Sequence, residues 1–316
     1  MNLVFFGSSK YSIPALKSLI KSGFKPIVVT IPDKPAGRHL KLQPNPLALF
    51  ARENKLAVLK LNKLNKKTLK KLTGTPPRSQ SPPRRSSYQI FTPEESRPTS
   101  GVFFGICCVY GKIIPQIWFD YFDNGIINLH PSLLPKYRGP SPAQFALLNN
   151  EAETGISFIK MDKICDHGPL IYQEKDKILP IDTAESLYNR LFGLAAEKLP
   201  WVIENFLKGK LKEIPQKHAL ASFTKMLQKQ DGFIEKKDLK KALINERLAK
   251  LIDRKIRAFT PWPGIYTMVN FKGEEKRLKI LKTHLKKDLL MIEEVQLEGK
   301  NPVTFLQFSS SYPQVF

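Results

Sequence analysis

Residues 1–31 constrain the fold of this chain more than any other stretch. Residues 2–7 form an apolar run ending in glycine, which is typical of a buried parallel strand. Residues 13–20 carry apolar side chains at helical spacing, Gly23 ends that helix, and residues 27–31 form a second apolar run. This order predicts a β-α-β unit, and therefore an α/β fold with a doubly wound, mostly parallel sheet. A single glycine after the first strand is not a dinucleotide fingerprint, so it predicts no NAD site.

Further segments continue this pattern to about residue 207. Apolar runs predict strands at 57–59, 102–109 and 154–161. Helical spacing predicts helices at 47–54, 143–148, 184–192 and 199–207. Together they predict an N-terminal α/β domain over residues 1–205, followed by a linker over 206–225.

A different pattern begins beyond this linker, over residues 226–316. A helical stretch rich in lysine and arginine is predicted at 239–257. Alternating apolar segments then predict short strands at 265–269, 278–282, 289–295 and 302–308. Short strands at such spacing are typical of a small, OB-like β-barrel, and a basic barrel of this kind commonly binds nucleic acid.

Residues 73–100 interrupt the first domain with a polar stretch rich in proline, serine and arginine. This composition cannot build a packed strand or helix, so we expect disorder. Two origins stay open from the sequence: an inserted basic loop, or the product of a damaged reading frame.

Charge and cysteine usage narrow the class of protein. The formal net charge of +23 favours a polyanionic partner, nucleic acid above all, although a lysine-rich proteome with a solvated surface is the alternative. Two of the three cysteines, Cys107 and Cys108, are adjacent, which is incompatible with a normal disulfide framework. The chain also shows no charged leader and no apolar run of about 18 residues. We therefore expect a cytoplasmic protein.

The candidate catalytic residues are Asn128, His130 and Asp166. Asn128 and His130 follow a short apolar run and lie two residues apart, so in an extended segment both side chains point to the same side. Pro131 stops the chain from continuing as a central strand. Asp166 lies in a turn-like sequence after another apolar segment. An amide donor, an imidazole and a carboxylate are suited to attack at a carbonyl-type carbon.

Five stretches of the chain together resemble a known family. They are Asn128–Gly139, the Asp166-x-Gly168 motif, Pro32–Arg38, Tyr110–Pro115 and Arg257–Gly264. With them the chain resembles the formyltransferase family that uses 10-formyltetrahydrofolate, and more narrowly the branch that acts on methionyl-tRNA. The resemblance covers nearly the whole chain except about residues 73–100, where the family has only a few residues.

The resemblance implies a reaction and a set of site residues. A formyl group would pass from the co-substrate 10-formyltetrahydrofolate to the methionine amino group of initiator methionyl-tRNA. Asn128, His130 and Asp166 would be catalytic, with residues 1–205 as the formyltransferase domain and no metal needed. The expected folate contacts are Tyr110, Gly111, Ser132, Leu133, Leu134 and Pro135.

The same resemblance implies a tRNA interface shared by the loop at 32–46 and the C-terminal domain. That loop is rich in proline and carries cations at its centre, which suits phosphate contacts. The expected tRNA contacts are Arg38, Lys41, Arg254 and Arg257. We expect a monomer that binds tRNA and the folate co-substrate and does not associate with a membrane.

Two other functions stay open from the sequence. The first is a formyltransferase with a small amine acceptor, such as glycinamide ribonucleotide or an amino-sugar nucleotide. The second is a degenerate, non-catalytic RNA-binding copy. The basic C-terminal domain argues against the first, because a small substrate needs no such module.

Overall fold

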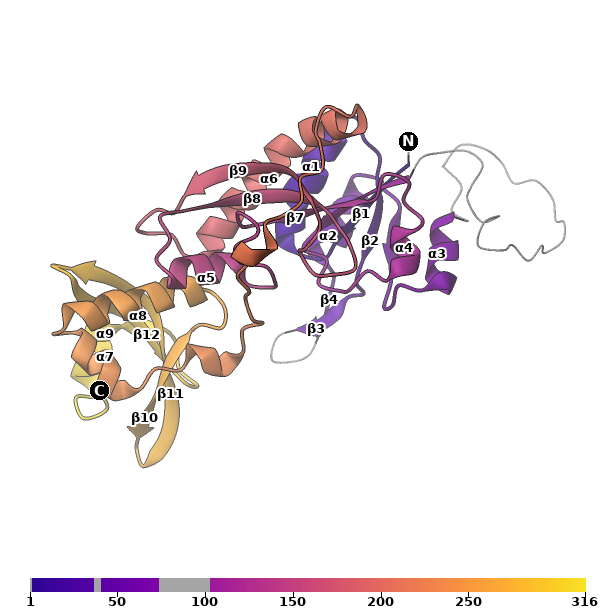
Figure 1. The fold of residues 1–316 in the computed structure, drawn as a ribbon. Helices are drawn as coiled ribbons and strands as arrows, with labels where there is room; N and C mark the ends of the chain where they lie inside the picture. Colours follow the sequence, from indigo (N-terminus) through magenta and orange to yellow (C-terminus); the bar gives the residue numbers. More distant parts are fainter. Residues whose placement is uncertain (1, 37–40, 74–102) are drawn as a thin grey trace. The chain divides into compact units, whose positions relative to one another are not determined.

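A computed structural model of the chain describes residues 2–36, 41–73 and 103–316. The chain divides into two compact units. Unit 1 comprises residues 1–130, 156–173 and 192–217, and unit 2 comprises residues 131–155, 174–191 and 218–316. Figure 1 follows the chain from indigo at the N-terminus to yellow at the C-terminus.

A seven-stranded sheet runs in the order β5-β2-β1-β6-β7-β8-β9. Figure 1 labels β1, β2, β7, β8 and β9 of this sheet. Its strands are β1 (Asn2–Gly7), β2 (Ile27–Thr30), β5 (Val58–Lys60), β6 (Phe103–Cys108), β7 (Ile126–His130), β8 (Glu153–Lys160) and β9 (Leu170–Lys177). The neighbours from β5 to β7 pair in parallel, and β8 pairs antiparallel to β7. The predicted α/β class with a mostly parallel sheet is confirmed.

The apolar run at the N-terminus becomes the central strand β1 because both of its faces are buried. Val4, Phe5 and Phe6 have no solvent exposure. The ring of Phe6 meets Tyr110, Trp118 and Phe122 edge-on, with centroids 5.6–5.8 Å apart. These aromatic rings form the centre of the core on one face of the sheet.

Short helices connect and cover these strands, and local sequence sets where they begin. They are α1 (Ile13–Lys21), α2 (Pro46–Glu53), α3 (Lys66–Thr73) and α4 (Gln116–Phe119). At α2, the Asn45 side chain accepts hydrogen bonds from the backbone N–H groups of Leu47 and Ala48, and Pro46 occupies the first turn. Neither α3 nor α4 was expected from the sequence.

Helix α6 (Ala184–Leu207) is one continuous helix, so the prediction of two helices at 184–192 and 199–207 is wrong. Pro200, which lacks a backbone N–H, lies inside this helix. A proline inside a helix costs about 3 kcal/mol. The buried side chains of Leu191, Leu199 and Ile203 keep one face of the helix packed across this point. Their burial offsets the lost hydrogen bond.

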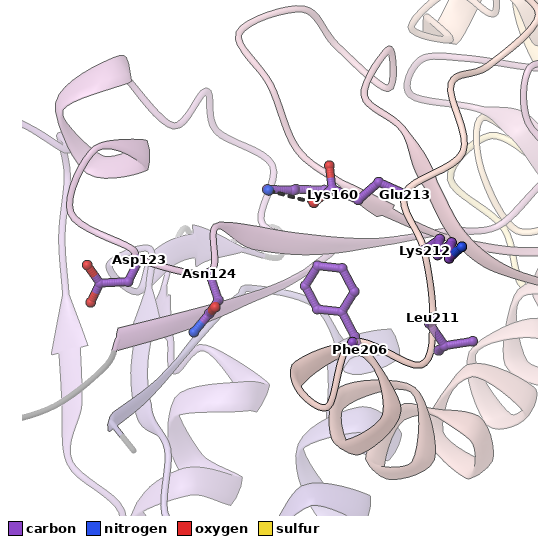
Figure 2. A pocket seen from close by; sticks show the side chains of 8 residues that line it. Asp123, Asn124, Lys160, Phe206, Leu211, Lys212 and Glu213 are labelled. Carbon is purple, nitrogen blue, oxygen red and sulfur yellow. Dashed lines mark hydrogen bonds and ion pairs between the residues drawn. The ribbon is translucent and has the colours of Figure 1, made fainter.

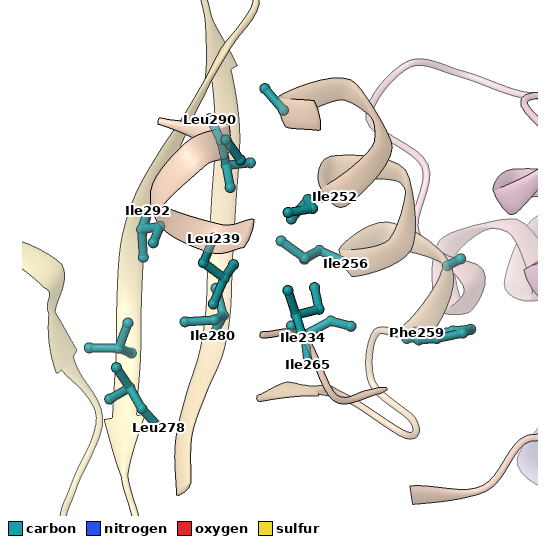
Figure 3. Close-up of a cluster of buried hydrophobic side chains, with 14 of the residues drawn as sticks. Ile234, Leu239, Ile252, Ile256, Phe259, Ile265, Leu278, Ile280, Leu290 and Ile292 are labelled. Atoms are coloured by element: carbon teal, nitrogen blue, oxygen red, sulfur yellow. The ribbon is translucent and has the colours of Figure 1, made fainter. Parts of the chain in front are cut away.

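The core of unit 2 lies between helices and a four-stranded antiparallel sheet (Figure 3). The strands are β10 (Ile265–Phe271), β11 (Glu274–Lys286), β12 (Leu289–Leu297) and β13 (Val303–Thr304). The helices are α5 (Pro142–Leu148), α7 (Lys236–Ala242), α8 (Glu246–Phe259) and α9 (Phe305–Ser311). Ile252 and Ile256 on α8 face Ile280 and Leu290 of the sheet. This packing explains the alternating apolar pattern of the C-terminal strands.

Two expectations for unit 2 were wrong in detail. The helical stretch at 239–257 is two helices, because the Asn245 side chain accepts a hydrogen bond from the backbone of Leu248 and starts α8. The strand expected at 302–308 is only β13, followed at once by α9. Thr304 and Gln307 form a capping box that begins this helix.

Two segments with predictions from the sequence are described by the structure only in part. The loop expected at 32–46 contains a hairpin of β3 (Lys34–Ala36) and β4 (Lys41–Gln43). The stretch at 73–100 lies outside the described residues, apart from Thr73 at the end of α3. Among the described residues, no helix combines the length and apolar character that a bilayer crossing requires.

Candidate active site

Strand β7 carries Asn128 and His130 at its carboxyl end, on the same face. The alternation of a strand predicts this, and the burial pattern agrees with a strand packed on both sides. His130 is almost completely buried and pairs across the strands with Ser157 of β8. The sequence therefore places both side chains correctly without knowledge of the tertiary structure.

Asp166 approaches both residues from the turn that follows β8. The amide of Asn128 donates a hydrogen bond to Oδ1 of Asp166 at 3.2 Å. Nδ1 of His130 lies 3.4 Å from the same oxygen. The structure thus brings the three predicted catalytic side chains together within unit 1. They lie near the carboxyl ends of the parallel strands, where α/β proteins commonly bind ligands.

The turn that presents Asp166 depends on close backbone contacts. Asp166 itself has φ +51°, in the left-handed region that aspartate tolerates better than most residues. A Cβ atom on Gly168 would lie only 1.9 Å from the carbonyl oxygen of Lys160, so this position needs glycine. Nδ1 of His167 lies 2.7 Å from Oδ2 of Asp162, and this contact stabilises the turn.

A second turn leaves β6 next to the same edge. Val109 has φ +51°, which is unusual for a β-branched residue. Ser8 holds this turn, because its hydroxyl donates to the carbonyls of Val109 at 3.0 Å and Tyr110 at 2.9 Å. Gly111 follows with φ +72° and an exposed backbone. Such local strain is common at functional sites.

The predicted folate residue Tyr110 lies mostly in the aromatic core. It is buried, and its hydroxyl has no hydrogen-bond partner among the described residues. Burial, with a smaller contribution from Cys107, raises the pKa of its phenol to about 12. Cys107 sits beside Asn128 in the neighbouring strand. Burial and the charge of Asp166 raise the pKa of the Cys107 thiol to about 12, so both groups stay neutral near pH 7.

The segment Ser132–Pro135 follows His130 and belongs to unit 2. Ser132 is fully buried, and its hydroxyl donates to the carbonyl of Lys136 at 2.7 Å. Leu134 is also buried, whereas Leu133 and Pro135 are half-buried. Ser132 therefore braces its own loop, and Leu133 and Pro135 present the accessible surface of the segment.

The four predicted tRNA contacts have different environments. Arg38 lies outside the described residues, and Lys41 begins β4, of which the backbone is described. Arg254 on α8 is half-buried. The guanidinium of Arg257 donates to Asp253 at 2.8 Å and to the carbonyl of Asp182 at 3.1 Å. Arg257 thus has a structural task within unit 2, in addition to any contact with RNA.

Two glutamines next to this site were not identified from the sequence. Gln173 donates to the hydroxyl of Ser157 at 2.8 Å, directly across from His130. Gln216 donates to the carbonyls of Asp166 at 2.9 Å and Gly168 at 2.7 Å. Gln216 lies 50 residues from Asp166 along the chain, so only the fold reveals its role. The strand β9, which carries Gln173, was also not predicted.

A cavity of about 420 Å³ opens elsewhere on unit 1 (Figure 2). Asp123, Asn124, Phe206 and Glu213 are among its lining residues, with Lys160 paired to Glu213 at 2.7 Å. Lys160 pairs with Ile127 in the sheet, so its side chain lies on the face opposite Asn128 and His130. This cavity is therefore not part of the candidate active site.

The arrangement suits acyl-type transfer. Asn128 provides an amide donor, His130 provides an imidazole, and Asp166 contacts both. Such donors stabilise the negative charge that develops when a nucleophile adds to a carbonyl carbon. Among the described residues, no group of three or more His, Cys, Asp and Glu side chains is arranged to hold a metal ion.

Residues 1–203 match the family described as formyl transferase, and residues 242–289 match the formyl transferase C-terminal domain. The chain belongs to the formyl transferase family. A methionyl-tRNA formyltransferase from Methylacidiphilum infernorum is 31% identical over 98% of this formyltransferase and 94% of its own length. The family suggested by the sequence motifs is thereby confirmed.

Two solved structures share the fold of this formyltransferase. One is an N-formyltransferase from Helicobacter canadensis in complex with folinic acid and dTDP-3-aminofucose, with a TM-score of 0.59 and 18% identity, covering 90% of this chain and 88% of that one. The other is the methionyl-tRNA formyltransferase from Clostridium thermocellum, with a TM-score of 0.55 and 18% identity, covering 94% and 98%. Because both likenesses are at low identity, they concern the fold and leave the acceptor to other arguments.

Proposed function

We propose that this formyltransferase transfers the formyl group of 10-formyltetrahydrofolate to the amino group of methionine on initiator methionyl-tRNA. The convergence of Asn128, His130 and Asp166 at the end of β7 carries the proposal of formyl transfer. The full-length similarity to a methionyl-tRNA formyltransferase supports the acceptor. The net charge of +23 also favours a nucleic-acid acceptor over a small amine.

The proposed reaction is an attack of the amine on the formyl carbon. A new C–N bond forms and the carbonyl oxygen becomes an oxyanion. The amide of Asn128 and the imidazole of His130 stabilise this oxyanion, and one such donor typically contributes about 2.7–4 kcal/mol. The bond from the formyl carbon to the folate nitrogen then breaks. The attacking amine loses one proton, for which Asp166 is the acceptor directly or through water, and the departing nitrogen gains one.

For the folate co-substrate we propose contacts at two segments. One is the turn after β6, where the Gly111 backbone is exposed beside the sheet edge. The other is the loop Ser132–Pro135, where Leu133 and Pro135 offer accessible apolar surface. Ser132 and Leu134 would support that loop from within, and buried Tyr110 would support the first turn. This assignment fits a folate's pterin ring, because apolar side chains can pack on its flat faces and exposed backbone groups can bind its polar edge.

For tRNA we propose the loop that carries Arg38 and Lys41, together with the C-terminal region that carries Arg254 and Arg257. Residues 1–205 would form the catalytic domain, 206–225 the linker and 226–316 the RNA-binding domain. Basic side chains on such surfaces neutralise phosphates and make binding depend on salt. A reaction in the cytoplasm by a monomer is part of the same proposal.

One assay separates this function from the two alternatives. Purified protein is supplied with 10-formyltetrahydrofolate and, in parallel, with charged initiator methionyl-tRNA, glycinamide ribonucleotide and an amino-sugar nucleotide. Formylation of methionyl-tRNA alone is the expected result. Transfer only to a small amine would replace the proposed acceptor, and tRNA binding without any turnover would indicate a non-catalytic copy.

The role of the N-terminal loop is tested by salt dependence. We expect Arg38→Ala with Lys41→Ala to weaken tRNA binding and to reduce the slope of log K against log salt by about 1–2. Turnover at saturating tRNA should stay within about twofold of wild type, because phosphate contacts position the substrate and do no chemistry. The double variant of the exposed Lys17 and Lys21 on α1 is a control with the same loss of charge. An unchanged slope would rule the loop out.

A further inference from the structure

We propose that Gln216 is a positioning residue for the active site, holding the turn that presents Asp166. The inference rests on the formyl-transfer function proposed above. Gln216 falls in the stretch that the sequence suggested to be a linker. In the structure its side chain is almost completely buried, with 4% exposure. A buried amide in a linker needs a reason, and its hydrogen bonds supply one.

The side-chain amide of Gln216 joins the two ends of the Asp166 turn. Its nitrogen donates to the carbonyl of Asp166 at 2.9 Å and to the carbonyl of Gly168 at 2.7 Å. A primary amide has two N–H donors, so one group can serve both carbonyls. The two bonds hold the backbone on either side of residue 167. They therefore restrain the left-handed conformation of Asp166 that aims its carboxylate.

Neighbouring contacts anchor Gln216 itself. The strap, defined as residues 213–216, is held at its first two residues. Glu213 pairs with Lys160 at 2.7 Å (Figure 2), and Ile214 exchanges two backbone hydrogen bonds of 2.8 Å with Leu170. Lys160 and Leu170 flank the catalytic turn in sequence. The strap thus spans the base of the turn and delivers the Gln216 amide to its inside.

This arrangement connects the strap to the reacting groups through one oxygen atom. Oδ1 of Asp166 accepts from Asn128 at 3.2 Å and lies 3.4 Å from His130. A displacement of the turn would lengthen both contacts together. Errors of about 1 Å in the placement of catalytic groups can cost 100-fold in rate. Gln216 does not need to touch either substrate to act in this way.

The main test replaces the amide while keeping the volume, as Gln216→Met in the full-length protein. We expect kcat to fall about 10- to 100-fold while KM for each substrate changes less than about threefold. Assays are run well below the melting temperature of each variant. Gln116→Met is the control for loss of a glutamine amide, because the Gln116 amide donates to the exposed Asp120 at 2.7 Å, and it should leave kcat within twofold. An unchanged kcat in Gln216→Met, or a change confined to KM, overturns the proposal.

A second variant keeps the test decisive if Gln216→Met does not fold. In Gln216→Glu, a protonated acid can donate one hydrogen bond, whereas a carboxylate faces two carbonyl oxygens with no donor. The ratio of variant to wild-type kcat should therefore be highest at low pH and fall as pH rises. A ratio that does not depend on pH overturns the role of the donor.

A measurement without substrate separates this inference from the choice of acceptor. The ring resonance of His130 should move in Gln216→Met and stay in place in Gln116→Met, because the partner carboxylate shifts only in the first. A ring resonance that does not move overturns the inference. If wild type fails to formylate methionyl-tRNA, the proposed acceptor is wrong, and this measurement still decides the role of Gln216.

Discussion

Asp166 in unit 1 is half-buried and Asp182 in unit 2 is buried. Both have basic partners, and they are held very differently. Asp182 accepts hydrogen bonds from Arg190 at 2.7 and 2.8 Å, from Ser186 at 2.7 Å and from the backbone of Leu179 at 2.7 Å. The carboxylate of Asp166 accepts hydrogen bonds from Asn128 at 3.2 Å and from the Cys165 thiol at 3.3 Å, and it lies 3.4 Å from Nδ1 of His130. One carboxylate is closely bound on both oxygens, and the other meets its partners at longer range.

The different hydrogen-bond lengths around Asp182 and Asp166 indicate different roles for the two aspartates. Short bonds to Asp182 connect the start of α6 to its own first turns, and Arg257 adds a bond to the Asp182 carbonyl from α8. Such a closed network contributes to stability and has no group left to react with a substrate. Around Asp166, backbone strain and longer contacts are typical of active sites, where hydrogen bonds often shorten only when substrate binds.

The largest effect is expected from a substitution that removes the Asp182 carboxylate. Asp182→Ala should lower the free energy of unfolding by about 2–4 kcal/mol, because it removes the buried carboxylate that accepts hydrogen bonds from Arg190, Ser186 and Leu179. Turnover per folded molecule should change less than twofold. Chemical denaturation and a kcat measurement at low temperature check both points. Asp288→Ala, which removes the exposed partner of Lys250, should cost less than about 1 kcal/mol.

The stabilisation by Asp182 should also depend on pH. Burial raises the pKa of Asp182, but the hydrogen bonds from Arg190 and the Leu179 backbone outweigh it and lower the pKa overall. A folded pKa below the unfolded value of about 3.9 means that the stabilisation is present above that pH and is lost as pH falls. The stability difference between wild type and Asp182→Asn should therefore be constant from about pH 7 to 5 and shrink below about pH 4. A difference that grows in acid would contradict this account.

At the other cluster, loss of the imidazole should affect chemistry alone. His130→Ala should lower kcat at least 100-fold, about 2.7 kcal/mol, because a donor to the oxyanion is removed. Affinity for tRNA should stay similar, and a binding assay beside the kinetic one tests this. His284→Ala, an exposed histidine paired with Glu293, is the control and should leave kcat unchanged. Equal losses of affinity and turnover would refute the role given to His130.

A smaller effect is expected from the backbone of the catalytic turn. In Gly168→Ala the new methyl group would meet the Lys160 carbonyl at 1.9 Å, so the turn must shift. We expect about a tenfold loss of kcat, since Asp166 moves with the turn. Gly193→Ala in α6 has open space around the new methyl and should be neutral or slightly stabilising. Wild-type kcat in Gly168→Ala would show that the turn tolerates displacement.

Local patterns were enough to predict most strands and to select the three candidate catalytic side chains that the structure brings together. Strand alternation put Asn128 and His130 on one face, and the apolar runs marked β1, β2, β6 and β8. Predictions failed where packing overrides a local signal. Pro200 lies inside α6 because the buried face of that helix continues past it. At α9 the local sequence carries two competing signals, apolar alternation and the capping-box spacing of Thr304 and Gln307, and the capping box determines the structure.

The amino-acid sequence by itself determined the α/β class, the family and the side-chain types at the candidate active site, because these depend on short-range spacing and motif identity. Tertiary structure alone decided which distant residues support that centre. Gln216 reaches Asp166 and Gly168 only because the strap pairs with the start of β9. The same is true of Arg257, whose bond to the Asp182 carbonyl gives it a structural task. Hydrogen bonds between residues far apart in the chain depend on the folded backbone, which no local pattern encodes.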